Sequence, residues 1–128
     1  ICADIEDQIM GLDNEERETF MKEIGLGKTG LIKLIREGYD LLNLDTYFTS
    51  GPEESRAWTI KKNTLAPQAA AVIHTDFEKN FIRAEAVSCD DFIKYGSSEK
   101  CKENGKLRVE GKDYIVKDGD VLFFRVNP

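Results

Sequence analysis

The apolar side chains of the first 42 residues recur at the spacing of amphipathic helices. They form three groups, each of which fits one face of a helix: Ile5, Ile9 and Leu12; Phe20, Met21 and Ile24; and Leu31, Leu34, Ile35 and Leu42. Gly11 falls at the end of the first group, and Gly25 and Gly27 follow the second, at places where helices commonly end. Asp13 or Asn14 and then Thr29 can cap the helices that follow, and Glu16 has the capping-box spacing from Asp13. The pattern predicts three successive helices.

After Asn43 the pattern changes to short β-branched and aromatic runs separated by turn residues. Strands are predicted at 44–49, 56–60, 81–87, 107–109, 114–116 and 121–126. Helices are predicted among them, with starts or caps at Pro67, at Ser88 with Asp91, and at Ser97 or Ser98. This order, with a hairpin near the end, predicts an α+β fold in which helical residues 1–43 precede a ubiquitin-like β-grasp over 44–128. Periodicity alone also allows a split α+β sandwich.

Charge is distributed unevenly between these two parts. The 128 residues carry a formal charge of -6; the first 50 hold 11 acidic and 5 basic side chains, and the remainder holds 13 of each. This balance excludes a strongly basic nucleic-acid binder of the histone kind. The second part is neutral overall, and local basic patches on it can still attract phosphates.

Composition also limits the compartment and the chemistry. Cys2, Cys89 and Cys101 form no C-x-x-C pair, no signal-peptide pattern opens the chain, and no apolar run reaches the roughly 18 residues that span a membrane. These features predict a cytoplasmic protein without membrane contact. Three cysteines and one histidine are too few for a rich metal site, so no metal ligands are assigned.

Catalytic motifs are sparse in the sequence. Gly27, Lys28 and Thr29 match the last letters of a phosphate-binding loop, but the earlier glycine is missing and a predicted helix precedes them where that motif requires a strand. His74, the only histidine, could act as the base for a cysteine nucleophile, contact a phosphate, or cap the segment 76–81. The cap is the favoured interpretation, and we expect no catalysis by this chain alone.

A mixed basic and aromatic set lies between the second and third predicted strands. It comprises Trp58, Lys61, Lys62, His74, Lys79 and Arg83. Basic side chains beside aromatic rings on a sheet are typical of proteins that bind looped or single-stranded RNA, so the five basic members are candidate RNA or ribosome contacts. The alternative is that Trp58 belongs to the core and that the basic side chains are only solvated.

Long segments of the chain resemble one family. The C-terminal TGS domain of the YchF/Obg-like ATPases is similar to LNLDTYFT (42–49), AWTIKK (57–62), APQAA (66–70), IHTDFEK (73–79), FIRAE (81–85) and EGKDYIVKDGDV (110–121). The resemblance covers essentially all 128 residues. It implies that residues 1–43 are the C-terminal helical part of a nucleotide-binding domain and that residues 44–128 are a TGS domain.

The resemblance further implies a parent protein that binds ATP, or GTP, together with Mg²⁺ and associates with ribosomes. Its phosphate-binding loop, Mg²⁺ ligand and base-specificity motif would lie upstream of Ile1, so no cofactor is expected in this chain. Cys2 and Ala3 resemble a degenerate Ser-Ala-Lys motif that lies beside the nucleotide base in related proteins. Because Cys replaces Ser and Asp4 replaces Lys, only the backbone of Cys2 and Ala3 is expected to contact a nucleotide.

The sequence therefore leaves two hypotheses for the binding function. In the first, a TGS module contacts the ribosome or RNA through the five basic residues. In the second, the module docks onto a protein, or in cis onto the upstream nucleotide-binding domain and gates it, with Trp58 and Phe48 as anchors. The burial of Trp58 separates the two, because a fully buried tryptophan cannot anchor an interface. A Cys–His hydrolase is the enzymatic alternative.

Overall fold

The computed structural model describes all residues, 1–128, which divide into two compact units. We call Ile1–Leu42 the helical unit and Asn43–Pro128 the β-rich unit. The helical unit contains α1 (Ala3–Met10), α2 (Asn14–Glu23) and α3 (Gly30–Leu41), in agreement with the three predicted helices. No helix in the chain is both long and apolar enough to cross a membrane.

Capping side chains begin α2 and α3 in the helical unit, whereas no side chain caps α1. The predicted capping box is confirmed: Asp13 Oδ1 accepts the Glu16 N–H at 2.9 Å, and Glu16 Oε2 accepts the Asp13 N–H at 3.3 Å. At the start of α3 the Gly30 N–H donates to Glu6 Oε1 at 2.6 Å. A Cβ at position 30 would lie at 2.6 Å from the same oxygen, so glycine permits this close approach.

The β-rich unit is built on one five-stranded sheet. Its strands are β1 (Leu44–Ser50), β2 (Ser55–Lys61), β3 (Phe81–Ser88), β4 (Arg108–Glu110) and β5 (Asp120–Val126), in the spatial order β2-β1-β5-β3-β4. Strands β1 and β5 are parallel, and the other neighbours are antiparallel. The last strand therefore lies in the middle of the sheet, which is the β-grasp arrangement that the sequence predicts.

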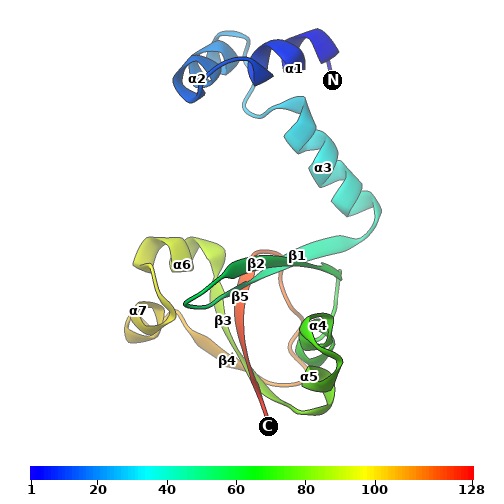
Figure 1. Ribbon diagram of the computed structural model, residues 1–128, viewed down its shortest axis with the longest axis vertical. Helices are drawn as coiled ribbons and strands as arrows, with labels where there is room; N and C mark the ends of the chain where they lie inside the picture. Colours follow the sequence, from blue (N-terminus) through cyan, green and yellow to red (C-terminus); the bar gives the residue numbers. More distant parts are fainter. The chain divides into compact units, whose positions relative to one another are not determined.

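Helices cover both faces of this sheet (Figure 1). On one side lie α4 (Ala66–Ile73) and α5 (Thr75–Lys79), and on the other lie α6 (Cys89–Tyr95) and α7 (Ser98–Glu103). Ser88 and Ser97 cap α6 and α7 through side-chain oxygens that accept backbone N–H groups, as predicted from the sequence. Pro67 is the second residue of α4, in the first turn where its missing N–H costs no hydrogen bond.

The main core lies between the sheet and α4. Its buried members are Tyr47, Ile60, Ala66, Ala69, Ala70, Phe81, Ala84, Ala86, Val116 and Leu122. The small alanine side chains let α4 lie close to the strands, and the Tyr47 hydroxyl donates to the Ala69 carbonyl oxygen at 2.8 Å. Burial raises the pKa of Tyr47 above its ordinary value, so this hydroxyl stays protonated. On the other face, Val87 and Val121 are buried, and Phe92 of α6 contacts Phe123 of β5.

The predicted strand at 114–116 and its hairpin are wrong. Only an isolated bridge joins Ile115 to Leu65, and β4 pairs with β3 instead. The Val116 N–H donates to the Thr64 carbonyl, and the Tyr114 carbonyl accepts the Ala66 N–H, so this segment is held against the start of α4. Tertiary contacts thus override the local β-propensity of the segment.

Candidate nucleic-acid interface

The five basic residues predicted to contact RNA do not form one patch. Lys61 ends β2, at the edge of the sheet, and Lys62 follows it; Arg83 lies on β3, three strands away, or roughly 14 Å. His74 caps α5 and Lys79 ends it, on the side of the sheet that α4 also covers. Lys61 and Lys79 are exposed, and neither ammonium group takes part in an ion pair. The structure therefore distributes the set over several surfaces.

His74 is a helix cap, as predicted. Its Nδ1 accepts the Asp76 N–H at 3.2 Å, and the ring lies at 5.8 Å from the Phe77 ring, between centroids. A ring nitrogen that accepts a hydrogen bond carries no proton, so the neutral ring carries its proton on Nε2. The exposed ring can still present that Nε2–H to a ligand, and its role as a phosphate contact stays a prediction.

Arg83 shares one carboxylate with Arg125, a residue that the sequence analysis did not single out. Arg125 binds both oxygens of Glu85, at 3.0 and 3.3 Å, and Arg83 Nη2 lies at 3.6 Å from Glu85 Oε1. Hydrogen bonding from Arg125 lowers the pKa of Glu85 and outweighs the opposing effect of partial burial. Two guanidinium groups on one carboxylate leave an excess positive charge on neighbouring strands β3 and β5.

Trp58 is half-buried, so the docking hypothesis is not excluded on that ground. The indole Nε1–H donates to Thr49 Oγ1 at 2.9 Å, and the Arg56 guanidinium lies at 5.1 Å from the ring centroid. The rest of the ring packs against the main core. The cation that accompanies this aromatic ring is thus Arg56, two positions earlier on the same face of β2, and not one of the predicted lysines.

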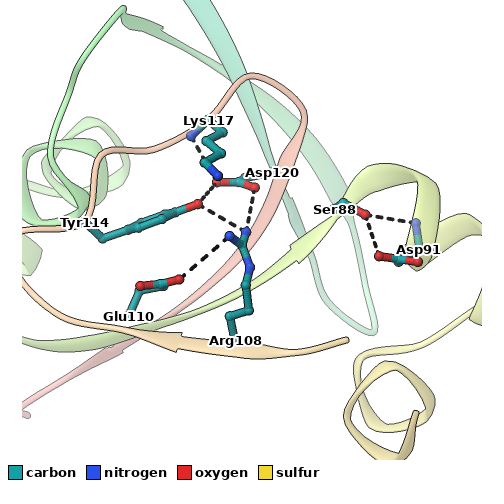
Figure 2. A network of polar contacts seen from close by, with 7 residues as sticks. All are labelled: Ser88, Asp91, Arg108, Glu110, Tyr114, Lys117 and Asp120. Carbon is teal, nitrogen blue, oxygen red and sulfur yellow. Dashed lines mark hydrogen bonds and ion pairs between the residues drawn. The ribbon is translucent and has the colours of Figure 1, made fainter. Parts of the chain in front are cut away.

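A polar network anchors the segment between β4 and β5 (Figure 2). The buried Asp120 carboxylate accepts hydrogen bonds from the Tyr114 hydroxyl at 2.6 Å, the Lys117 backbone N–H at 3.0 Å and Arg108 Nη2 at 3.3 Å. Arg108 also lies at 3.8 Å from Glu110 Oε1. Burial and then the hydrogen bond to Asp120 raise the pKa of Tyr114 to about 12. The network fixes the orientation of the Arg108 side chain.

Beside this network the surface forms a cavity of about 410 Å³, which we call the polar hollow. It is lined by Ser88, Asp91, Gly105, Lys106, Arg108, Lys117, Asp118, Gly119 and Asp120. On another side of the polar hollow, the Ser88 hydroxyl donates to the Asp91 carboxylate at 2.9 Å, as Figure 2 shows. The sequence analysis missed this cavity, because its lining comes from β3, α6, β4, the start of β5 and two loops. Its only sequence signals were the predicted cap at Ser88 and the turn before β5.

The structure offers no support for a cysteine–histidine pair. His74 precedes β3 and Cys89 follows it, and the strand between them is roughly 23 Å long. Cys101 is buried, and its thiol points to the Asp91 carbonyl oxygen at 3.6 Å. Burial raises the pKa of Cys101, which disfavours the reactive thiolate.

The remaining predicted site residues lie at the start of the helical unit. Cys2 and Ala3 are exposed at the first turn of α1, where the Cys2 carbonyl accepts the Glu6 N–H at 3.1 Å. Their contact with a nucleotide stays a prediction. No group of three or more histidine, cysteine, aspartate or glutamate side chains is placed to hold a metal ion.

Comparison with known proteins identifies relatives of the chain. Residues 44–127 match the family YchF-GTPase_C, described as a protein of unknown function (DUF933). The "Ribosome-binding ATPase YchF" of Escherichia coli O157:H7 is 59% identical over 127 residues, or 99% of this chain and 35% of that protein. The protein of the same name from Bacillus subtilis is 50% identical over the same coverage, and "Obg-like ATPase 1" of Pongo abelii is 48% identical over 96% of this chain and 31% of that protein.

A solved structure extends the likeness to three dimensions. The structure of the Schizosaccharomyces pombe YchF GTPase covers 92% of this chain with a TM-score of 0.75 at 41% identity, and the match takes up 31% of that protein. The chain thus spans about a third of the length of the relatives that it matches. It belongs to the YchF-GTPase C-terminal family, as the TGS-containing portion of a YchF/Obg-like protein.

Proposed function

We propose that this chain is the ribosome- or RNA-binding module of a YchF-type ATPase and that it has no catalytic activity by itself. The observation that carries the proposal is its family membership, together with the name "Ribosome-binding ATPase" that several relatives bear. In the proposed parent protein, ATP and Mg²⁺ bind to a nucleotide-binding domain that lies outside these residues. The chain contributes contacts and not chemistry.

Exposed cations on the β-rich unit support this function. Lys61 and Lys79 have no internal partner, and the group of Arg83, Glu85 and Arg125 carries a net positive charge. Each phosphate that such side chains neutralise releases counterions, which lowers the slope of log affinity against log salt by about 0.7 on a single strand. The binding is therefore expected to be sensitive to salt although the whole chain is acidic.

Co-sedimentation with ribosomes between 50 and 200 mM KCl, about the range over which phosphate contacts lose strength, tests the proposal. The triple variant Lys61→Ala/Lys79→Ala/Arg83→Ala is expected to bind about tenfold more weakly than the unmodified chain. The matched control Lys22→Ala/Lys28→Ala/Lys33→Ala removes the same charge from the helical unit. A salt-independent bound fraction, or equal losses in both variants, contradicts the proposal.

Docking onto the nucleotide-binding domain is the second candidate, and the half-buried ring of Trp58 favours it. In a full-length protein whose other tryptophans are replaced, docking predicts a blue shift of the Trp58 emission when ATP binds. An emission maximum that does not change with nucleotide rules out ATP-dependent docking through Trp58.

A further inference from the structure

We propose that the polar hollow is a phosphate-binding subsite, in which Lys106, Lys117 and Arg108 donate hydrogen bonds to the oxygens of a phosphate group. Where that phosphate belongs to RNA, the subsite deepens the proposed function and rests on it. Where it is inorganic phosphate, the subsite stands on its own geometry. The lining carries three basic and three acidic side chains, so the argument depends on which of them already have partners.

The carboxylates of the polar hollow are already bound to donors within the protein. Asp120 accepts hydrogen bonds from Tyr114, Arg108 and the Lys117 backbone. Asp91 accepts the Ser88 hydroxyl, and Asp118 Oδ1 accepts the Thr46 N–H at 2.8 Å. Both oxygens of Asp120 and one oxygen each of Asp91 and Asp118 therefore hold the surrounding loops and helix in place.

The polar hollow also holds donors that have no partner within the protein. Lys106 and Lys117 are exposed, and neither ammonium group has an ion-pair partner in the structure. Arg108 uses Nη2 for Tyr114 and Asp120, its Nη1 lies at 3.8 Å from Glu110 Oε1, and these contacts orient the guanidinium before any ligand arrives. Two unused ammonium groups beside an oriented guanidinium complement a ligand with several acceptor oxygens, and phosphate is the common group of that kind.

The walls of the polar hollow also indicate which part of a nucleotide it would hold. No aromatic or aliphatic side chain lines the cavity, so a base would find no ring on which to stack. A volume of about 410 Å³ is large enough for a phosphate and its adjoining riboses. We therefore expect contacts with the RNA backbone that do not depend on base sequence.

An amide NMR titration of the 128-residue chain tests the subsite. The probes are decamers of U and of A, sodium phosphate, and sodium chloride at matched ionic strength. Saturable shifts are expected at Gly105, Lys106 and Gly119, with dissociation constants for the two decamers within about twofold of each other. Shifts with decamers alone assign the site to RNA, and shifts with inorganic phosphate as well assign it to any phosphate. Shifts that sodium chloride reproduces, or that avoid these residues, overturn the proposal.

Matched variants separate the subsite from general charge. Lys106→Ala/Lys117→Ala is expected to weaken decamer binding about tenfold, because two charge-assisted hydrogen bonds are lost. Both side chains are exposed and unpaired, so the variant should keep its fold and its amide spectrum elsewhere. Lys100→Ala/Lys102→Ala removes the same charge from α7, outside the lining, and should change the constant less than about twofold. Equal losses in the two variants overturn the proposal.

The subsite and the proposed function fail in different experiments. Amide shifts at the polar hollow with inorganic phosphate, but without decamer binding or ribosome co-sedimentation, contradict only the proposed function. Ribosome co-sedimentation without hollow shifts contradicts only the subsite.

Discussion

The helical unit and the β-rich unit use their apolar residues in opposite ways. In the β-rich unit, apolar strand positions such as Tyr47 and Leu122 are buried in a core that the unit completes by itself. In the helical unit only Ile9 is buried, and the apolar face of α3 remains open, with Leu34 57% exposed and Leu31 52% exposed. Both patterns are equally regular along the sequence. Periodicity therefore predicts an element and its apolar face, but not what covers that face.

This difference predicts that most of the folding free energy resides in the β-rich unit. The largest test is Leu122→Ala, which removes a side chain from the centre of the core and should cost about 2–5 kcal/mol. Leu34→Ala, the same substitution on the exposed face of α3, should cost less than about 0.5 kcal/mol. Urea unfolding followed by circular dichroism covers the helices of both units, and the fluorescence of Trp58, the only tryptophan, reports on the β-rich unit alone. Similar losses of unfolding free energy in both variants would show that the two units contribute alike to stability.

An effect of intermediate magnitude is expected at Tyr114 when the pH is alkaline. Its folded pKa of about 12 lies above the ordinary value of 10.0, so the contribution of its neutral hydroxyl is fully present below pH 10 and is lost as the pH rises toward 12. Tyr114→Phe should cost about 1 kcal/mol at pH 8 and reduce the loss of stability above pH 10. The measurement is the urea midpoint at several pH values. Tyr95→Phe leaves the network intact and should keep the full loss of stability at alkaline pH. An undiminished loss in Tyr114→Phe would show that the network is not its source.

The smallest expected effect concerns two helix N-caps of similar geometry. Asp13→Ala and Ser97→Ala each remove an N-cap acceptor, and each loss should cost about 1 kcal/mol where the helix is coupled to a folded core. Ser97→Ala should lower the Trp58 unfolding midpoint, because α7 belongs to the β-rich unit. Asp13→Ala should leave that midpoint unchanged and increase hydrogen exchange only at residues 14–23. A lower midpoint in both variants would show that the two units unfold as one.

Local chemistry explains why most of the elements could be predicted. The cap at Asp13 with Glu16 and the cap at Ser88 with Asp91 are signals that lie within four residues, and the structure contains both. The strand predicted at 114–116 failed for the opposite reason. Its hydrogen bonds go to Thr64 and Ala66, some fifty residues earlier, and no local pattern encodes that choice.

The candidate site could be predicted only in part. The cap at His74 could be predicted from the sequence because its partner, Asp76, is two residues away. The pairing of Arg83 with Arg125 through Glu85, and the polar hollow, depend on β5 lying beside β3. Sequence proximity suggested a cluster of basic residues, whereas the order of the strands in the sheet decides which of them are neighbours.

The position of β5 also has a consequence for synthesis of the protein. The pair β1–β2 and the pair β3–β4 meet only through β5, which leaves the translation machinery roughly seventy residues after β1. At ordinary elongation rates, about 5–20 residues per second, the first hairpin waits for several seconds before its permanent neighbour exists. During that interval the side of β1 that will pair with β5 is an unpaired edge, and the apolar side chains of the future core are open to other chains. The β-rich unit is therefore expected to depend on chaperones until its final strand is made, and a nascent chain stalled before Asp120 should be captured by them.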